Sequence, residues 1–175
     1  KSLEGCDNTK VGGEFICNSA GLMRLDGCPE AKSYNFENNR LTSLDGFNKE
    51  RVDGKLNLRN NEISSLEGCP EQVYGKFNCS NNELVDLVGG PKTVKGDYDC
   101  SANNIWTYDG FPNYMAGEVI WQGLNPVQNV SNLFSFYPGR LNKVIDSIIE
   151  WEVIDAENKS VSYMRACEVY NDLDT

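Results

Sequence analysis

The sequence predicts a solenoid, in which short coils of chain stack on one another, and three recurring features predict it. A Leu-acid-Gly tripeptide, or a close variant, returns about every 21 residues. A pair of apolar residues separated by one position returns with the same step, and in most units an asparagine follows this pair three residues later. Repetition at a fixed period of this length is typical of repeat folds, in which each unit buries its apolar edges against its neighbours.

The apolar pair predicts one short strand in each unit. Residues at positions i and i+2 of a strand face the same side, so both can enter one core. Strands of successive coils would then pair in parallel, about 4.8 Å apart. The pairs are Phe15 and Cys17, Tyr34 and Phe36, Leu56 and Leu58, Phe77 and Cys79, Tyr98 and Cys100, and Val119 and Trp121.

The tripeptide glycine and the asparagine predict the turns. Glycine adopts backbone conformations that other residues resist. The tripeptides are Leu3-Glu4-Gly5, Leu25-Asp26-Gly27, Leu44-Asp45-Gly46, Leu66-Glu67-Gly68, Leu87-Val88-Gly89 and Tyr108-Asp109-Gly110. The asparagine amide can pair with backbone groups that would otherwise be buried without partners. These structural asparagines are Asn39, Asn61, Asn82 and Asn103, and we expect the preceding Asn38, Asn60 and Asn81 to be exposed.

One unit matches a known repeat motif. Leu56, Leu58, Asn61 and Ile63 reproduce the pattern L-x-L-x-x-N-x-L, so the chain resembles the leucine-rich-repeat family over roughly residues 3 to 122. The resemblance implies an α/β repeat: a right-handed leucine-rich-repeat solenoid with a parallel sheet on its concave face. The convex stretch between Gly68 and Val73 is too short for a helix, so we expect turns or 3₁₀ pieces there.

The first two units depart from this pattern. Ala20 stands where the structural asparagine stands later, and the second unit is shortened between Gly27 and Tyr34. We therefore expect an atypical first coil, as a cap or a frayed end.

The composition changes after residue 122, which divides the chain into a solenoid, 1–122, and a C-terminal segment, 123–175. Three helices are predicted there: one opening at Asn125-Pro126 and running to about Phe134, one over residues 141–149, and one beginning after Asn158 with Ser160 near its cap. The apolar stripes are Leu141, Val144, Ile145, Ile148 and Ile149, then Val161, Met164, Cys167 and Tyr170. We interpret the segment as a small helical cap over the open end of the solenoid. The alternative is an aromatic binding surface formed by Trp106, Trp121, Phe134, Phe136 and Trp151.

The outward positions of the predicted strands are the candidate binding site. Their residue types vary while the inward ones stay apolar, and solenoids use such concave surfaces to bind partners. The candidate partner-binding residues are Asn35, Glu37, Asn57, Arg59, Asn78, Ser80, Asp99, Ser101 and Gln122, with Glu14, Ile16, Lys55, Lys76, Asp97, Glu118 and Ile120 beside them. The alternative is a solvated face on which Asn35, Asn57 and Asn78 form a stacked amide ladder.

Composition narrows the function. The formal charge of −10 disfavours direct binding of nucleic acid or of anionic membranes, and no stretch approaches the roughly 18 to 20 apolar residues of a membrane span. The chain has no histidine, so catalysis by a Ser-His or Cys-His pair is excluded. Zinc sites often use histidine ligands, so a metal site is also disfavoured. We expect no cofactor, no metal and no enzymatic activity.

The cysteines favour a reducing compartment. Most occupy equivalent positions in several units, which indicates packing, since a free cysteine behaves as a small buried hydrophobe. The alternative is a disulfide between stacked equivalents such as Cys79 and Cys100, for which parallel stacking gives poor geometry. We therefore expect a cytoplasmic protein.

The predicted function is a protein–protein interaction module. A solenoid of this unit length, followed by an Asn-Pro segment and helices, also resembles uncharacterised repeat proteins of large bacteriophages. That resemblance implies a phage-encoded inhibitor or modulator of a bacterial host protein, acting in the host cytoplasm. Two alternatives remain: an acidic mimic that occupies a DNA- or RNA-binding site, and a hydrolase that uses surface carboxylates such as Asp97 and Asp99.

Overall fold

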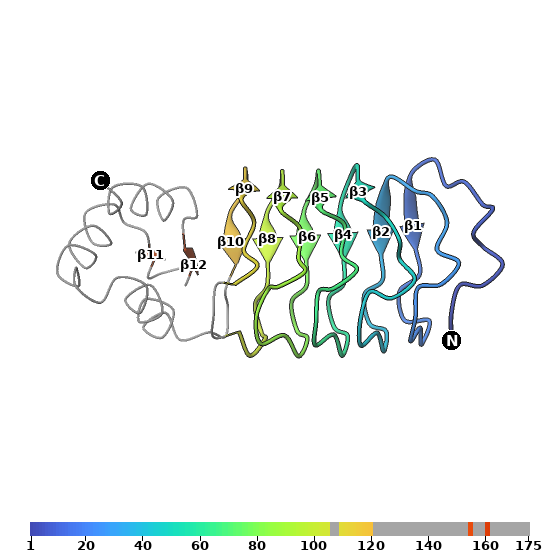
Figure 1. Ribbon diagram of the computed structural model, residues 1–175, viewed down its shortest axis with the longest axis horizontal. Helices are drawn as coiled ribbons and strands as arrows, with labels where there is room; N and C mark the ends of the chain where they lie inside the picture. The colour runs from blue at the N-terminus through green and yellow to red at the C-terminus, as the bar shows by residue number, and fades with distance from the viewer. Residues whose placement is uncertain (106–108, 121–153, 156–159, 162–175) are drawn as a thin grey trace.

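A computed structural model describes residues 1–105, 109–120, 154–155 and 160–161, and within them the chain is a parallel β-solenoid of stacked coils (Figure 1). One strand per coil builds the parallel part of the first sheet, in which neighbouring strands pair in parallel. Its strands are β1 (Glu14–Ile16), β2 (Ser33–Asn35), β4 (Leu56–Asn57), β6 (Phe77–Asn78), β8 (Tyr98–Asp99) and β10 (Val119–Ile120). The predicted stack of parallel strands is confirmed.

The inward side of these strands forms one continuous core. Leu56 lies beside Phe77, and Phe77 beside Tyr98, because each strand pairs with the next in the same register. All three side chains are fully buried, as is Leu58 two positions after Leu56. The core therefore consists of rows of equivalent residues, and each coil completes the burial of its neighbours.

The Leu-acid-Gly tripeptides form tight turns. In the third unit the Phe47 N–H donates to the Leu44 carbonyl at 3.0 Å, and Gly46 has a φ of +83°. A positive φ at the third residue of a hydrogen-bonded turn defines type II geometry, which favours glycine. A Cβ on Gly46 would also lie only 2.4 Å from the Asp26 backbone nitrogen of the preceding coil. Glycine is thus required here both by conformation and by the close stacking of coils.

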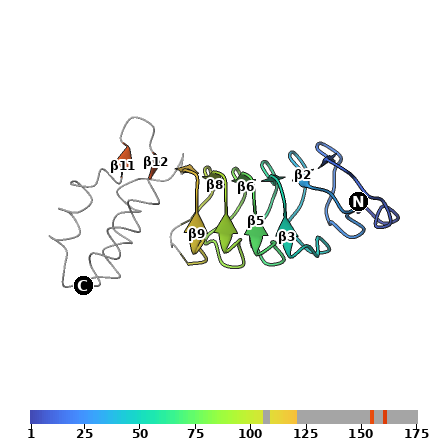
Figure 2. The same ribbon diagram turned by 90° about the horizontal axis from the view of Figure 1, so that it is seen from above.

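A second parallel sheet occupies the side where we expected turns or 3₁₀ pieces. Its strands are β3 (Arg51–Val52), β5 (Gln72–Val73), β7 (Thr93–Val94) and β9 (Tyr114–Met115), in the order β3-β5-β7-β9. Figure 2 shows the two sheets on different sides of the coils. Val52, Val73 and Val94 point inward and are fully buried, so stacking of equivalent inward residues accounts for this second ladder.

The shortened second unit contributes no strand to the second sheet within residues 28–34, all of which the structure describes. Phe47 from the next coil is fully buried beside this unit. Its ring packs edge-on against Tyr34, with 4.9 Å between ring centroids, and against Phe36 at 5.8 Å. The second unit has no valine at the position equivalent to Val52, and this aromatic cluster forms part of its core.

The expected helix start at Ser160 is wrong. Residues Ser160–Val161 form strand β12, which pairs antiparallel with β10 and with β11 (Ile154–Asp155). The last parallel strand leaves backbone N–H and C=O groups at its edge, and an extended segment satisfies them as a helix terminus does not. The other expected helices, the boundary at residue 122 and the five candidate aromatics lie outside the described residues.

The described part of the chain contains no helix of the length and apolarity needed to cross a membrane.

The strand face as a candidate partner-binding site

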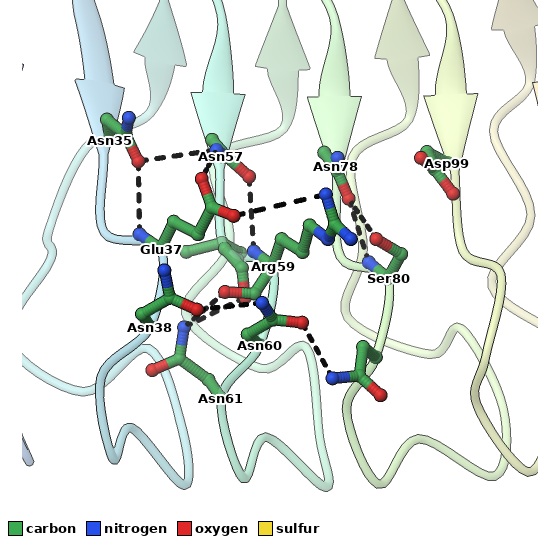
Figure 3. A network of polar contacts seen from close by, with 12 residues as sticks. Asn35, Glu37, Asn38, Asn57, Arg59, Asn60, Asn61, Asn78, Ser80 and Asp99 are labelled. Carbon is green, nitrogen blue, oxygen red and sulfur yellow. Dashed lines mark hydrogen bonds and ion pairs between the residues drawn. The ribbon is translucent and has the colours of Figure 1, made fainter. Parts of the chain in front are cut away.

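The outward side of the first sheet, with the residues that flank its strands, is the strand face. The structure brings together six of the predicted site residues on it: Asn35, Glu37, Asn57, Arg59, Asn78 and Asp99 (Figure 3). They come from neighbouring strands in register, so they form rows that run across the coils. Gln122 lies outside the described residues.

Asn35, Asn57, Asn78 and Asp99 form the middle row of the face, and each accepts a hydrogen bond from the backbone just after its strand. The Asn57 Oδ1 accepts from the Arg59 N–H at 3.2 Å, and the Asp99 Oδ1 accepts from the Ser101 N–H at 3.2 Å. Asn35 and Asn78 make the same bond to the residue two positions on. Asparagine and aspartate favour this local turn because their side chains mimic a backbone carbonyl. The row is therefore structural as well as outward-facing.

Ser80 and Ser101 do not reach the surface. Both are buried, and their hydroxyls donate to Asn78 Oδ1 and Asp99 Oδ1, each at 2.7 Å. The turn at Asn78 or Asp99 bends the chain directly after the strand, which carries the serine inward. A partner that contacts the strand face therefore meets Asn78 and Asp99 but not these two serines.

The expected amide ladder is present at its first rung. Asn57 Nδ2 donates to Asn35 Oδ1 at 3.3 Å and to Glu37 Oε2 at 3.2 Å (Figure 3). The Asn78 amide oxygen instead accepts both donors of Ser80, and among the described residues no hydrogen bond links it to Asn57. The side chains of Asn35, Glu37 and Asn57 are thus fixed in place before any partner arrives.

The structural asparagines act as the sequence predicts. Asn61 Nδ2 donates to the carbonyls of Leu58 (2.9 Å) and Phe36 (3.0 Å), and its Oδ1 accepts from the Leu41 N–H (3.1 Å). One buried side chain therefore joins two coils. The same pattern recurs at Asn39, Asn82 and Asn103.

A second asparagine ladder was missed in the sequence. Asn60 Nδ2 donates to Asn38 Oδ1 at 2.7 Å, and Asn81 Nδ2 donates to Asn60 Oδ1 at 2.6 Å. All three residues have a positive φ, between 53° and 59°. Asparagine tolerates this left-handed conformation better than most residues. The repeated Asn-Asn pair was the available signal, since its first member occupies a position where most side chains are strained.

Three ion pairs cross the strand face. Lys55 Nζ lies 3.0 Å from Glu14 Oε1, Lys76 Nζ lies 3.9 Å from Asp99 Oδ2, and the Arg59 guanidinium lies 4.0 Å from Glu37 Oε1. In each pair the acidic side chain is the less exposed partner. The carboxylates lie low against the sheet, while the cationic ends stand further out.

Within the described residues, the buried cysteines and the candidate carboxylates Asp97 and Asp99 are neutralised by burial or already bonded. Six cysteines are free thiols, and burial raises the pKa of Cys79 and Cys100. A thiol held in its neutral form is a poor nucleophile. The candidate carboxylates already have partners: Asp97 Oδ1 accepts from the Glu118 N–H, and Asp99 accepts from Ser101. No group of three metal-ligating side chains suited to an ion occurs in the ranges that the structure describes.

The fold and this face define the class of protein: a parallel β-solenoid built from repeats of about 21 residues. Comparisons with protein-family models, with curated proteins and with solved structures found no match. The function is therefore argued from the geometry of the strand face.

Proposed function

We propose that this protein is a protein–protein interaction module that binds its partner through the strand face. One observation carries the proposal. The outward rows combine amides, carboxylates and cations, and internal hydrogen bonds hold Asn35, Asn57 and Glu37 in fixed positions. A surface that is ordered before binding loses less conformational entropy when the partner docks, so its contacts contribute more to affinity.

The sequence resemblance makes the proposal more specific. The Leu56, Leu58, Asn61 and Ile63 pattern, with an asparagine that joins successive coils, supports a leucine-rich-repeat type of solenoid. The likeness to phage repeat proteins supports a phage-encoded inhibitor or modulator of a bacterial host protein, acting in the host cytoplasm. Both statements are part of the proposal.

Site-specific photo-crosslinking tests which side binds. A photoreactive benzoylphenylalanine replaces Ile16 or Ile120 on the strand face, and in the matched controls it replaces Val85 or Val88 on the side that carries the Leu-acid-Gly turns. Ile16, Val85 and Val88 are exposed and Ile120 is partly exposed, and none is charged, so the surface charge stays unchanged. In bacterial lysate we expect one protein to crosslink from the strand-face positions at moderate salt.

The opposite labelling pattern would overturn the proposal. Crosslinks from Val85 and Val88 alone would assign binding to the turn side. The absence of any specific product from Ile16 and Ile120 would remove the strand face as a binding surface.

A second candidate function rests on the turn side. An acidic residue occupies the second position of five turns: Glu4, Asp26, Asp45, Glu67 and Asp109. This column is the feature that a nucleic-acid mimic would use. Coils about 4.8 Å apart place one charge per coil, which is sparser than the one charge per roughly 1.7 Å of duplex DNA. Crosslinks from Val85 and Val88 to several basic proteins, lost at moderate salt, would favour this function.

A further inference from the structure

Two lysines lie side by side on the strand face. Lys55 and Lys76 precede Leu56 and Phe77, which are register partners in β4 and β6. Their positions are therefore about 4.8 Å apart on adjacent strands, where like charges repel and lower stability. Their ammonium groups pair with acids on opposite sides, Lys55 with Glu14 of β1 and Lys76 with Asp99 of β8. These ion pairs draw the two ammonium groups apart, and in the described part of the chain neither acid pairs with both lysines.

Arg59 adds a third cation to the same coils. In all three ion pairs the cation is more exposed than its acidic partner: 53% against 26% for Lys55 and Glu14, 54% against 25% for Arg59 and Glu37, and 41% against 14% for Lys76 and Asp99. Exposed ion pairs of this kind hold each other weakly in water. The cationic ends are therefore the groups that an approaching partner meets first.

The cationic surface continues around the edge of the coils onto the second sheet. Tyr74 has the Arg51 guanidinium 5.5 Å and the Lys95 ammonium 3.9 Å from its ring centroid. Between the two sheets stand Gly54 and Gly75, where any Cβ would clash with a neighbouring coil or side chain. No side chain at these glycines separates the cations of one sheet from those of the other. We name Arg51, Lys55, Arg59, Lys76 and Lys95 the basic corner.

We propose that the basic corner binds an acidic segment of the partner protein, one rich in aspartate and glutamate. This inference rests on the proposed function and specifies the chemistry of the partner. Carboxylates of such a segment would accept charge-assisted hydrogen bonds from the exposed ammonium groups of Lys55 and Lys76. Charge complementarity of this kind also speeds association and rejects unsuitable partners.

The same residues disfavour a nucleic acid as the occupant. Asp53 and Asp99 lie among the cations, and the protein as a whole carries a charge of −10. The closely spaced phosphates of a nucleic acid would meet these carboxylates along the whole contact, which opposes binding. An acidic peptide can carry neutral residues between its acids, so the spacing of its charges can match that of the exposed cations, whereas the phosphate spacing of a nucleic acid is fixed.

Fluorescence anisotropy with defined probes tests the inference. The probe is a fluorescein-labelled peptide of alternating glutamate and serine, and the comparison probes are the same peptide with lysine for glutamate and a mixed-sequence single-stranded DNA. The test variant carries Lys55→Gln, Arg59→Gln and Lys76→Gln. The matched control carries Glu62→Gln, Glu67→Gln and Glu83→Gln, three exposed acids on the turn side of the same coils. A third variant, Lys55→Arg with Lys76→Arg, keeps the charge.

We expect the glutamate peptide to bind wild type at low salt, and the three lost cations to weaken binding about tenfold. The control and the arginine variant should bind as wild type does. No binding of the glutamate peptide, or equal binding by the Gln variant of the basic corner, overturns the inference. Tighter binding of DNA assigns the basic corner to nucleic acid, and tighter binding of the lysine peptide assigns binding to the turn-side acids. The glutamate peptide could fail to bind while the photoreactive residue at position 16 or 120 still crosslinks one protein. In that case the proposed function stands and only the acidic-segment inference is overturned.

Discussion

Tyr34 and Tyr98 occupy the same inward position of β2 and β8, yet within the described residues only the Tyr34 hydroxyl is bonded to backbone groups. It donates to the Pro29 carbonyl at 3.1 Å and accepts from the Ala31 N–H at 2.9 Å. The Tyr98 hydroxyl is buried and has no nitrogen or oxygen partner among the described residues. Lys95 corresponds to Ala31, but its N–H donates to the Val73 carbonyl in the second sheet. Formation of the second sheet has thus removed the donor that Tyr98 would need.

This difference predicts opposite effects for the same substitution. Tyr34→Phe leaves the Pro29 carbonyl and the Ala31 N–H without their partner, so we expect a loss of about 1 to 2 kcal/mol in the free energy of unfolding. Tyr98→Phe removes a buried hydroxyl that has no nitrogen or oxygen partner in the described part of the chain and meets the Cys79 thiol, so we expect no loss and a gain of up to about 1 kcal/mol. Urea unfolding of both variants measures the difference. Equal destabilisation by the two substitutions would mean that the Tyr98 hydroxyl has an unseen partner.

Ala102 offers a second test, because it continues the exposed asparagine ladder without an amide. It has a φ of +51°, at the position that Asn38, Asn60 and Asn81 occupy in earlier coils. An alanine in this conformation is strained by about 1 kcal/mol or more. Ala102→Asn relieves part of this strain and places an amide beside Asn81, so we expect a stabilisation of about 1 kcal/mol.

The contribution of the ladder itself is isolated by Ala102→Gly, which relieves the strain and adds no amide. We expect the thermal midpoint of the asparagine variant to exceed that of the glycine variant, and that of the glycine variant to equal or exceed wild type. A drop in the midpoint for both would contradict the left-handed conformation of residue 102.

The two members of an Asn-Asn pair should differ strongly in how much they contribute to the free energy of unfolding. Asn61→Ala leaves the buried Leu41 N–H without its partner and removes one of the two amide donors from each of the Leu58 and Phe36 carbonyls, so we expect it to cost about 2 to 3 kcal/mol. Asn60→Ala loses only exposed amide contacts and the left-handed preference, so we expect about 1 kcal/mol. Chemical denaturation of both single variants checks the order. A cost for Asn60→Ala as large as that for Asn61→Ala would show that the outer ladder, and not the buried one, holds the coils together.

The sequence allowed the solenoid, its core and its buried asparagines to be predicted, because each depends on a residue type that recurs at one position. The second sheet escaped prediction because each of its strands has one inward residue, such as Val52 or Val73, and so lacks the i, i+2 apolar pair that revealed the first sheet. The inward turn of Ser80 escaped because strict alternation along the strand places it outward. Asn78 Oδ1 accepts from both the N–H and the hydroxyl of Ser80, and this turn directly after the strand ends the alternation.

Strand β12 escaped for a different reason. Ser160 and Val161 suit a helix start as well as a strand, and the open edge of β10 that pairs with them is distant in sequence. The exposure of the charged side chains on the strand face also escaped prediction. The sequence places Lys55, Lys76 and Arg59 beside acids, but only the structure shows that the acids lie beneath the cations.

The buried thiols predict a loss of stability at alkaline pH. Burial raises the pKa of Cys79 and Cys100 above the ordinary value of 9.0, and that of Cys28 to about 12. The unfolded chain therefore releases these protons first, so the stability is fully present below about pH 9 and falls as the pH rises toward the folded-state values. Each thiol that ionises only on unfolding lowers the free energy of unfolding by up to about 1.4 kcal/mol per pH unit.

Urea unfolding at several pH values between about 8 and 9.5 measures this slope where the tyrosines of an unfolded chain, whose pKa is about 10, are still mostly protonated. The double variant Cys79→Ala, Cys100→Ala lowers stability at every pH through lost packing. Its decline above pH 9 should nevertheless be shallower than that of wild type, because two of the linked protons are gone. Parallel pH profiles for the two proteins would show that these thiols ionise equally well in the folded chain, which full burial of both side chains does not permit.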